Sequence, residues 1–206
     1  MIRKNCLMSI PSENQCYRIM AKMAMLPNIL AHSIRVCQVA TLLVESLNSG
    51  GRHLNPDLIK AAALLHDITK TRSLNTKERH DGTGADYLQE QGYPEVADTV
   101  RQHVRLAGFE AQGGPTAAEI VNYADKRVMH DTVVSLDERM ADLMKRYNGS
   151  SELGSWLDCM HREAEAIEAK LFADLPFSAT ELSDHLDLLD FEKKLERFRT
   201  ANQGSP

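Results

Sequence analysis

Apolar side chains recur every three to four residues along almost the whole chain, which is the period of an α-helix. Between residues 29 and 47 they follow the i, i+3, i+4, i+7 spacing that places them on one face of a helix. Alternating runs rich in valine, isoleucine and threonine, which are typical of strands, do not occur between turn signals. The pattern therefore predicts an all-α protein.

Capping residues and prolines set the expected boundaries of the helices. Capping boxes begin at Ser12, Thr116 and Ser135, and prolines at 27, 56 and 94 fit the first turn of a helix. The polar stretch 69–79 is expected to be a surface loop, the helix after Ser135 to stop at 148–149, and the tail 201–206 to be frayed. The predicted helices cover residues 12–25, 27–48, 55–67, 80–91, 94–103, 116–129, 135–147, 152–172 and 184–199.

The length of the chain, 206 residues, is that of one globular domain with a substantial core. We expect residues 1–134 to form the core with its N-terminal helix, and the helices of residues 135–206 to pack on the same domain. The amphipathic helices after Ser135 could serve a dimer as well as a core, so a homodimer is a further expectation.

The charge balance and the cysteines narrow the class of protein. A net charge of −5 shows no generic electrostatic footprint for nucleic acid or anionic lipid, so an anionic substrate must be bound by local positive charge. The four cysteines form no C-x-x-C pair, which favours reduced thiols over a zinc site or disulfides. No uncharged apolar run approaches the roughly 20 residues that span a bilayer, and the N-terminus lacks an apolar signal region. We expect a soluble cytoplasmic protein without a membrane partner.

Three His-Asp pairs occur in the chain, at 66–67, 80–81 and 130–131, so the pair alone is weak evidence for a site. Only His66 and Asp67 follow a run as apolar as AAALL. Ionisable side chains are costly to bury unless they are paired or bind a metal, which marks these two as ligands. Asp81 and Asp131 are interpreted as surface or capping residues.

The remaining histidines divide by their place on the predicted helices. His32, His66, His80 and His103 each lie on, or at the end of, a different helix, and Asp125 lies on a fifth. Helical bundles build metal sites from side chains on facing helices. The sequence therefore predicts a metal site from these residues, whereas the histidines without this relation are interpreted as structural or surface residues: His53, His130, His161 and His185.

These motifs resemble those of the HD-domain metal-dependent phosphohydrolases, whose signature is a His, a later His-Asp and a still later Asp. The resemblance covers about 26–129 and includes AHSIRVCQVA, AAALLHDITK and HDGTGADYL, with Thr69 where the family has glycine. It implies an HD-domain-like helical bundle with additional C-terminal helices. It also implies one or two divalent ions (Fe, Mn, Ni, Zn or Mg), the first held by His32, His66, Asp67 and Asp125 and the second by His80 and His103, with Asp67 bridging both.

Hydrolysis of a phosphate ester or anhydride is the reaction that this resemblance implies. Two metal ions lower the pKa of a bridging water and clamp phosphoryl oxygens during in-line displacement. Asp67 and Lys70 are the expected catalytic residues, because Lys70 lies one turn beyond Asp67 and could neutralise charge on the substrate phosphate. Weaker candidates for binding that phosphate are the basic residues near the proposed ligands: Arg35, Arg72, Arg105 and Lys126.

The substrate expected from the subfamily motifs is a small phosphorylated compound, with nucleotides as the first choice. The Glu-Asp pair of guanosine-polyphosphate hydrolases is missing, and Gly92-Tyr93-Pro94 lies in the wrong context for the cyclic-dinucleotide branch. The order of motifs is closer to the diadenosine-tetraphosphate hydrolases. The segment 123–140 also resembles the HD domain fused to molybdenum-cofactor nucleotidyltransferase-like proteins. The alternative is a regulatory module that binds metal or nucleotide without turnover.

Overall fold

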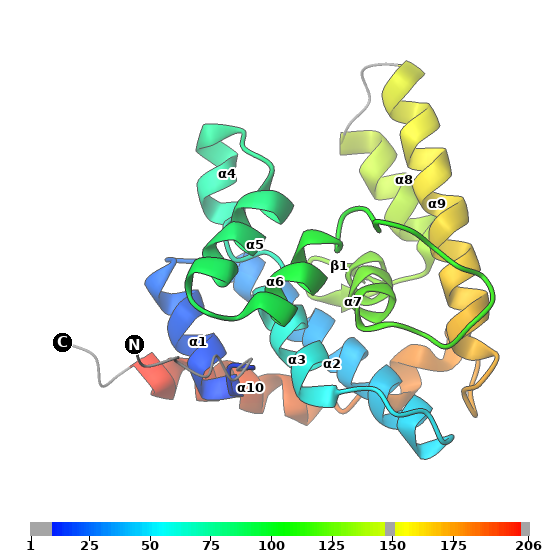
Figure 1. Cartoon of the computed structure of the whole chain (residues 1–206), viewed down its shortest axis with the longest axis horizontal. Coiled ribbons are helices and arrows are strands. Elements are labelled where there is room, and N and C mark those ends of the chain that lie inside the picture. The colour runs from blue at the N-terminus through cyan, green and yellow to red at the C-terminus, as the bar shows by residue number, and fades with distance from the viewer. Residues whose placement is uncertain (1–9, 147–150, 203–206) are drawn as a thin grey trace, which may run out of the picture.

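The computed structural model describes residues 10–146 and 151–202, and these form an all-α fold with one very short hairpin, as the apolar pattern predicts. Figure 1 shows the arrangement. The elements, in chain order, are α1 (Glu13–Lys22), α2 (Pro27–Ser49), α3 (Pro56–Leu65), α4 (Lys70–Thr76), α5 (His80–Glu90), α6 (Pro94–Arg101), α7 (Ala117–Lys126), β1 (Val128–Met129), β2 (Thr132–Val133), α8 (Leu136–Arg146), α9 (Ser151–Phe172), the 3₁₀ helix η1 (Ala179–His185) and α10 (Leu188–Asn202).

The predicted caps begin the helices where the sequence placed them. Ser12 and Gln15 form a reciprocal capping box at α1, and Thr116 and Glu119 form another at α7. The Asn55 side chain accepts hydrogen bonds from two backbone N–H groups in the first turn of α3. These caps satisfy donors that a helix cannot satisfy internally, so they fix the first residue of each helix.

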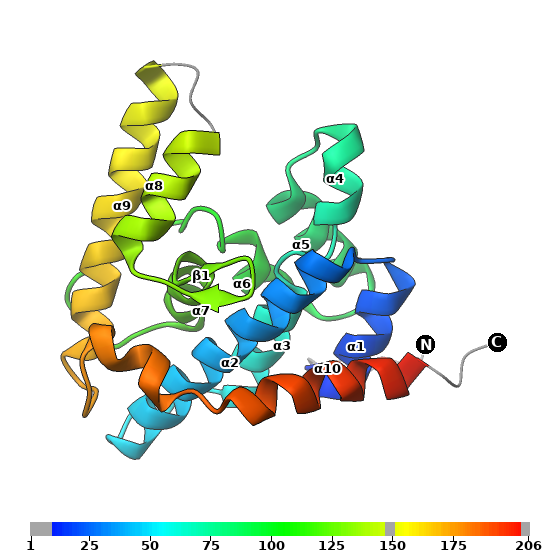
Figure 2. The same cartoon turned by 180° about the vertical axis from the view of Figure 1, so that it is seen from behind.

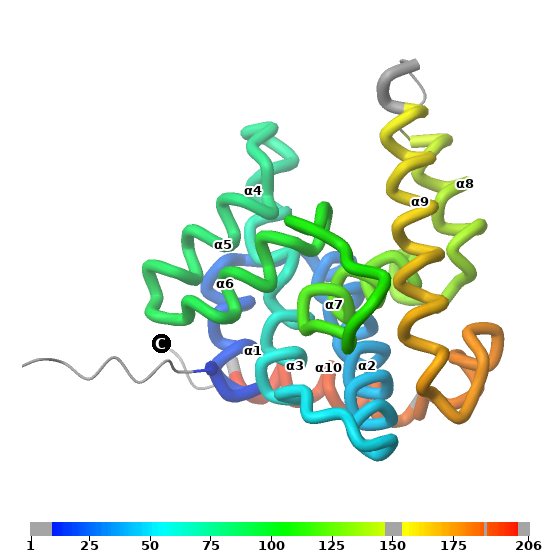
Figure 3. Tube along the Cα trace, turned by 45° about the vertical axis from the view of Figure 1, so that its right-hand side comes forward, coloured from blue at the N-terminus to red at the C-terminus, as the bar shows by residue number. Residues whose placement is uncertain are grey.

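The core is centred on α2 and α3, which lie side by side in the middle of the molecule (Figures 1 and 3). The length and composition of α2 would allow it to cross a membrane, yet 72% of its most apolar window is buried inside the protein. It also carries the buried polar residues His32, Arg35 and Gln38, which have partners inside the fold. These features identify α2 as the central core helix.

The C-terminal helices share the main core. Ile167 and Leu171 of α9 and Phe191 of α10 belong to the same buried cluster as α2 and α3. Figure 2 shows α10 running along the outside of α1 and α2, while α8 and α9 pair and stand away from the centre. The α8–α9 pair has a small cluster of its own, built on Met140, Leu157 and Met160.

Several predicted boundaries are wrong. Residues 70–76 form α4, although the stretch 69–79 was expected to be a loop, because a helix with no buried residue shows no apolar period. Residues 128–133 turn back as a β-hairpin where α7 was expected to continue to Met129. The helix after Pro94 ends at Arg101, two residues before His103, and α10 continues to Asn202, into the expected frayed tail. The predicted stop at 148–149 lies outside the described residues.

Candidate metal centre

His32 lies on α2 and reaches the centre of the molecule with a fixed ring orientation. Its Nδ1 donates a hydrogen bond of 2.8 Å to the carbonyl of His130, at the turn of the β-hairpin. Its Nε2 lies 2.9 Å from Oδ1 of Asp125, at the C-terminal end of α7. The hairpin that the sequence did not predict therefore orients a predicted site residue.

His66 and His103 are oriented in the same way, each by the turn that precedes it. Nδ1 of His66 donates to the carbonyl of Ala63 at 2.8 Å, and Nδ1 of His103 donates to the carbonyl of Val100 at 2.7 Å. A carbonyl oxygen only accepts, so the proton of each ring lies on Nδ1. The Nε2 atoms are left to face the centre with a lone pair, as in metal-bound histidines.

Asp67 lies between the two sets of histidines. Its Oδ1 is 3.2 Å from Nε2 of His80 and 3.6 Å from Nε2 of His103. Its Oδ2 is 3.5 Å from Nε2 of His66 and 2.9 Å from Nζ of Lys70. Each carboxylate oxygen therefore faces a different side of the centre.

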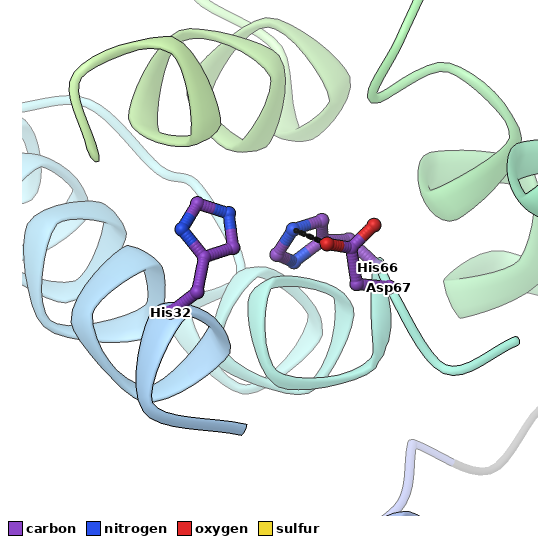
Figure 4. Close-up of side chains that lie close together, drawn as sticks. All are labelled: His32, His66 and Asp67. Atoms are coloured by element: carbon purple, nitrogen blue, oxygen red, sulfur yellow. Dashed lines mark ion pairs between the residues drawn. The ribbon is translucent and has the colours of Figure 1, made fainter. Parts of the chain in front are cut away.

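Within the described ranges, two groups of ligand atoms are compact enough to hold a metal ion. His32, His66 and Asp67 form one (Figure 4), and Asp67, His80 and His103 form the other. Within each group the candidate ligand atoms lie within 4.8 Å of one another. Asp125 adjoins the first group, with Oδ1 3.6 Å from Nε2 of His66. The structure thus brings together all six residues that the sequence analysis selected as ligands.

The donor atoms of this centre fit a divalent cation. Among the described residues, Nε2 of His66 and Oδ1 of Asp67 are buried without a hydrogen-bond partner. Buried acceptor atoms without a donor are unfavourable unless a positive charge lies beside them. Imidazole nitrogen with carboxylate oxygen is a donor set that suits Fe, Mn, Zn or Ni.

The electrostatics of the centre also favour a bound cation. Burial opposes charge on Asp67, but Lys70 and His66 outweigh burial and hold the pKa of this carboxyl well below its usual range. Burial would lower the pKa of His66, but the Asp67 carboxylate outweighs it and raises that pKa to about 10. The position beside Nε2 of His66 therefore attracts positive charge, which a proton or a divalent ion can supply.

Lys70 and Arg139 are two cations that border the centre. The side chain of Lys70 is 36% exposed, while its Nζ contacts Oδ2 of Asp67. Arg139, on α8, is buried; its Nη1 donates to Asp142 at 3.3 Å, and its Nε has no hydrogen-bond partner among the described residues. Both line a small cavity of about 80 Å³ that His32 and Asp67 border. Sequence reasoning missed Arg139, because basic candidates were sought only within a few residues of a proposed ligand, and Arg139 lies fourteen residues after Asp125.

The weaker basic candidates have other partners or lie on the surface, and one of them, Lys126, still borders the centre. Arg35 donates to the carbonyl of Asp131 and stacks on Phe191, while Arg72 pairs with Glu78 on the surface. Arg105 is exposed in the segment after His103. Lys126 is buried against Asn122, where burial lowers its pKa to about 8, although it borders a pocket next to the centre.

Two residues that were set aside have structural roles near the centre. Asp81 was interpreted as a surface or capping residue, but it is buried in the first turn of α5 and accepts a hydrogen bond of 2.6 Å from Arg79. His130 contributes its carbonyl oxygen to His32. Thr69, in place of the family glycine, donates from its hydroxyl to the carbonyl of His80 at 3.0 Å and so links the ends of two helices.

The fold and the site define a helical domain with a buried histidine and aspartate centre, and comparison with known proteins agrees with this class. Residues 29–130 match the HD domain family, so this segment is similar to an HD domain. An HD domain indicates a metal-dependent phosphohydrolase in general terms.

One curated relative matches the chain significantly. It is Ribonuclease Y of Fervidobacterium nodosum, 38% identical over 99 residues. The match covers 48% of this chain but only 17% of the relative, which is therefore much longer than the shared part. No solved structure matches the chain significantly.

Proposed function

We propose that this chain is a metal-dependent hydrolase of a phosphate ester or anhydride, with a nucleotide as its substrate. The observation that carries the proposal is the pair of ligand groups that share Asp67, each with histidine nitrogens aimed at a buried carboxylate. A structural protein would gain nothing from burying Nε2 of His66 and Oδ1 of Asp67 without a hydrogen-bond partner among the described residues. A regulatory module could use the same arrangement to bind metal or nucleotide without turnover. A measurement of hydrolytic activity therefore decides between an enzyme and a regulatory module.

The residues have distinct roles in this proposal. His32, His66, Asp67 and Asp125 hold a first divalent ion, and His80 and His103 hold a second together with Asp67. When bound, such ions lower the pKa of a water molecule and neutralise charge on phosphoryl oxygens. Hydrogen bonds from Nδ1 to backbone carbonyls keep three of the imidazoles in the tautomer that presents Nε2.

Lys70 and Arg139 bind the phosphoryl group of the substrate in this proposal. Nζ of Lys70 contacts Asp67 and its side chain is partly exposed, so it can contact the phosphate of an incoming substrate. Arg139 offers its Nε, a donor that has no partner in the part of the chain that the structure describes. Local positive charge of this kind explains how a chain with a net charge of −5 could take an anionic substrate.

RNA is the second candidate substrate, because the matched relative is called Ribonuclease Y. A phosphodiester of RNA and a nucleotide phosphate present the same phosphoryl chemistry to the centre. The acidic charge balance of the chain favours a small substrate over a polymer, which needs an extended basic surface. Dinucleoside polyphosphates remain within the proposed class, since they combine nucleotides with an anhydride.

The test is a metal assay on the purified full chain followed by hydrolysis of about thirty phosphorylated compounds with Mn²⁺, Fe²⁺ or Ni²⁺ added. The panel includes nucleotides, dinucleoside polyphosphates and short single-stranded RNA. We expect metal-dependent release of phosphate or nucleotide, with small nucleotides preferred to RNA. Metal binding without hydrolysis of any compound would favour the regulatory module, and preferred cleavage of RNA would favour the second candidate.

A further inference from the structure

A pocket of about 260 Å³ opens directly from the candidate metal centre toward the α8–α9 pair. We call it the α8–α9 pocket. One side is formed by residues of the centre or next to it: Lys70, His80, His103 and Asp125. The other side is apolar and is formed by Leu143, Trp156, Leu157 and Met160. The charged and apolar sides meet in one cavity, so a ligand in it can contact both.

The apolar side does not belong to the main core. Leu157 and Met160 are buried in the separate small cluster of α8 and α9, and Leu143 and Trp156 pack against it while only partly buried. A half-buried tryptophan in a pocket presents a large planar surface to a ligand. Because the pocket continues into the metal centre, this surface is placed beside the phosphate-binding part of the site.

Arg139 connects the two parts. It lines the α8–α9 pocket and also the small cavity that His32, Asp67 and Lys70 border. It is buried, and its Nε lacks a partner in the described part of the chain. A guanidinium group in this position can hold a phosphate while the rest of the ligand extends toward Trp156.

We infer that the α8–α9 pocket holds the base of the nucleotide, stacked on Trp156, while the phosphate lies beside Lys70 and Arg139 at the metal centre. The inference rests on the proposed function and adds that recognition of the base gives the site its specificity. Sites for drug-sized ligands measure about 300–1,000 Å³, so a pocket of about 260 Å³ suits a single ring system. Phosphate compounds without an aromatic group would leave the apolar side exposed to water.

Trp156 is the only tryptophan in the chain, so its fluorescence reports directly on this contact. Metal-loaded full-length protein is titrated with adenosine α,β-methylene diphosphate, which resists hydrolysis, and with methylenediphosphonate, which lacks the nucleoside. We expect the nucleotide analogue to quench the fluorescence and to bind about five- to a hundredfold more tightly, the range for stacking of one base on an aromatic side chain. Methylenediphosphonate should bind without comparable quenching.

Substitutions of Trp156 then identify the side chain, with calorimetry as the measurement because these variants have no tryptophan. Trp156→Leu should lose most of the preference for the nucleotide analogue, and Trp156→Phe should keep much of it. Affinity for methylenediphosphonate and the metal content should stay unchanged in both. Met144→Ala is the matched control, since Met144 is an exposed apolar side chain of the same helix pair.

The outcomes separate this inference from the function on which it rests. If both analogues bind equally and Trp156→Leu changes neither affinity, the inference is overturned while the proposed function stands. If neither analogue binds and no phosphate compound is hydrolysed, the proposed function fails and the inference fails with it. Equal loss of nucleotide affinity in Met144→Ala would also overturn the inference, because it would assign the effect to folding of the helix pair.

Discussion

Asp67 contacts more of the candidate centre than any other ligand, since its two oxygens face different sets of side chains. Oδ1 faces His80 and His103, whereas Oδ2 faces His66 and Lys70. The residue is almost completely buried, so water cannot take the place of a missing ligand or donor. A conservative change at this one position therefore affects both ligand groups together.

Asp67→Asn tests this directly. The amide keeps the size of the carboxylate but removes its charge and turns one acceptor into a donor that faces a histidine nitrogen or Lys70. We expect metal affinity and hydrolysis each to fall by more than about a hundredfold, beyond the 10–100-fold typical of residues that only support a ligand. Metal content by plasma emission and initial rates measure the two effects. The control is Asp86→Asn, whose carboxylate is 65% exposed in a surface ion pair, and full activity in Asp67→Asn would refute the assignment.

His80 and His103 decide whether the centre binds one ion or two. Both approach Oδ1 of Asp67 and neither contacts Asp125 in the described structure, so they form the separate side of the centre. Replacing either with alanine should lower the metal stoichiometry from two toward one while the first ion remains. His32→Ala should instead remove the first ion. One ion per chain in the fully loaded, unmutated protein would refute the second site and leave the first unaffected.

At the scale of elements, sequence reasoning succeeded where a helix has an apolar face and a cap, and failed where it has neither. The caps at Ser12, Asn55 and Thr116 mark true helix starts. The helix α4 was missed because all of its side chains lie outside the core. The hairpin was missed because strands of two residues are too short to show alternation. Both missed elements adjoin the centre, and neither contributes an apolar face to the core that a sequence pattern could show.

The hairpin has a testable role through its turn. His130 has a φ of +58°, a conformation that favours glycine, and its carbonyl oxygen accepts the hydrogen bond from His32. His130→Gly keeps that carbonyl in place, so metal content should stay unchanged and the free energy of unfolding should shift by no more than about 1 kcal/mol. Chemical denaturation and metal analysis measure these quantities, with His32→Ala as the comparison. Loss of metal in His130→Gly equal to that in His32→Ala would show that the imidazole of His130 is itself a ligand.

At the scale of the whole molecule, the centre lies where five separate segments meet, from α2 to α7. Periodicity predicts that each segment is helical, but it does not predict which helix ends face one another. The resemblance of residues 26–129 to the HD-domain phosphohydrolases supplied that information. Trp156, on α9, lies beyond every segment that resembles a known family, and Arg139, on α8, lies fourteen residues after the last proposed ligand, so no motif marked either residue. The C-terminal helices are also joined to α7 by a buried pair, Lys170 with Glu119, at 2.8 Å.

Removal of metal should therefore destabilise the whole molecule, because the ligands come from segments that span most of the core. An ion that binds only the folded state stabilises it by about 2.7 kcal/mol at a concentration of 100 times its Kd. For a chain of 206 residues this corresponds to a fall in Tm of about 5–11 °C on chelation. Calorimetry of the full chain with and without EDTA measures the shift, which excess Mn²⁺ should reverse.

Asp67→Asn should start from a low Tm or show little response to either reagent, since it can no longer bind the ion. An identical Tm with and without EDTA in a protein shown to contain metal would mean that the ion does not bind at this buried centre, because a site assembled from five segments cannot lose its ion without loosening the contacts among them.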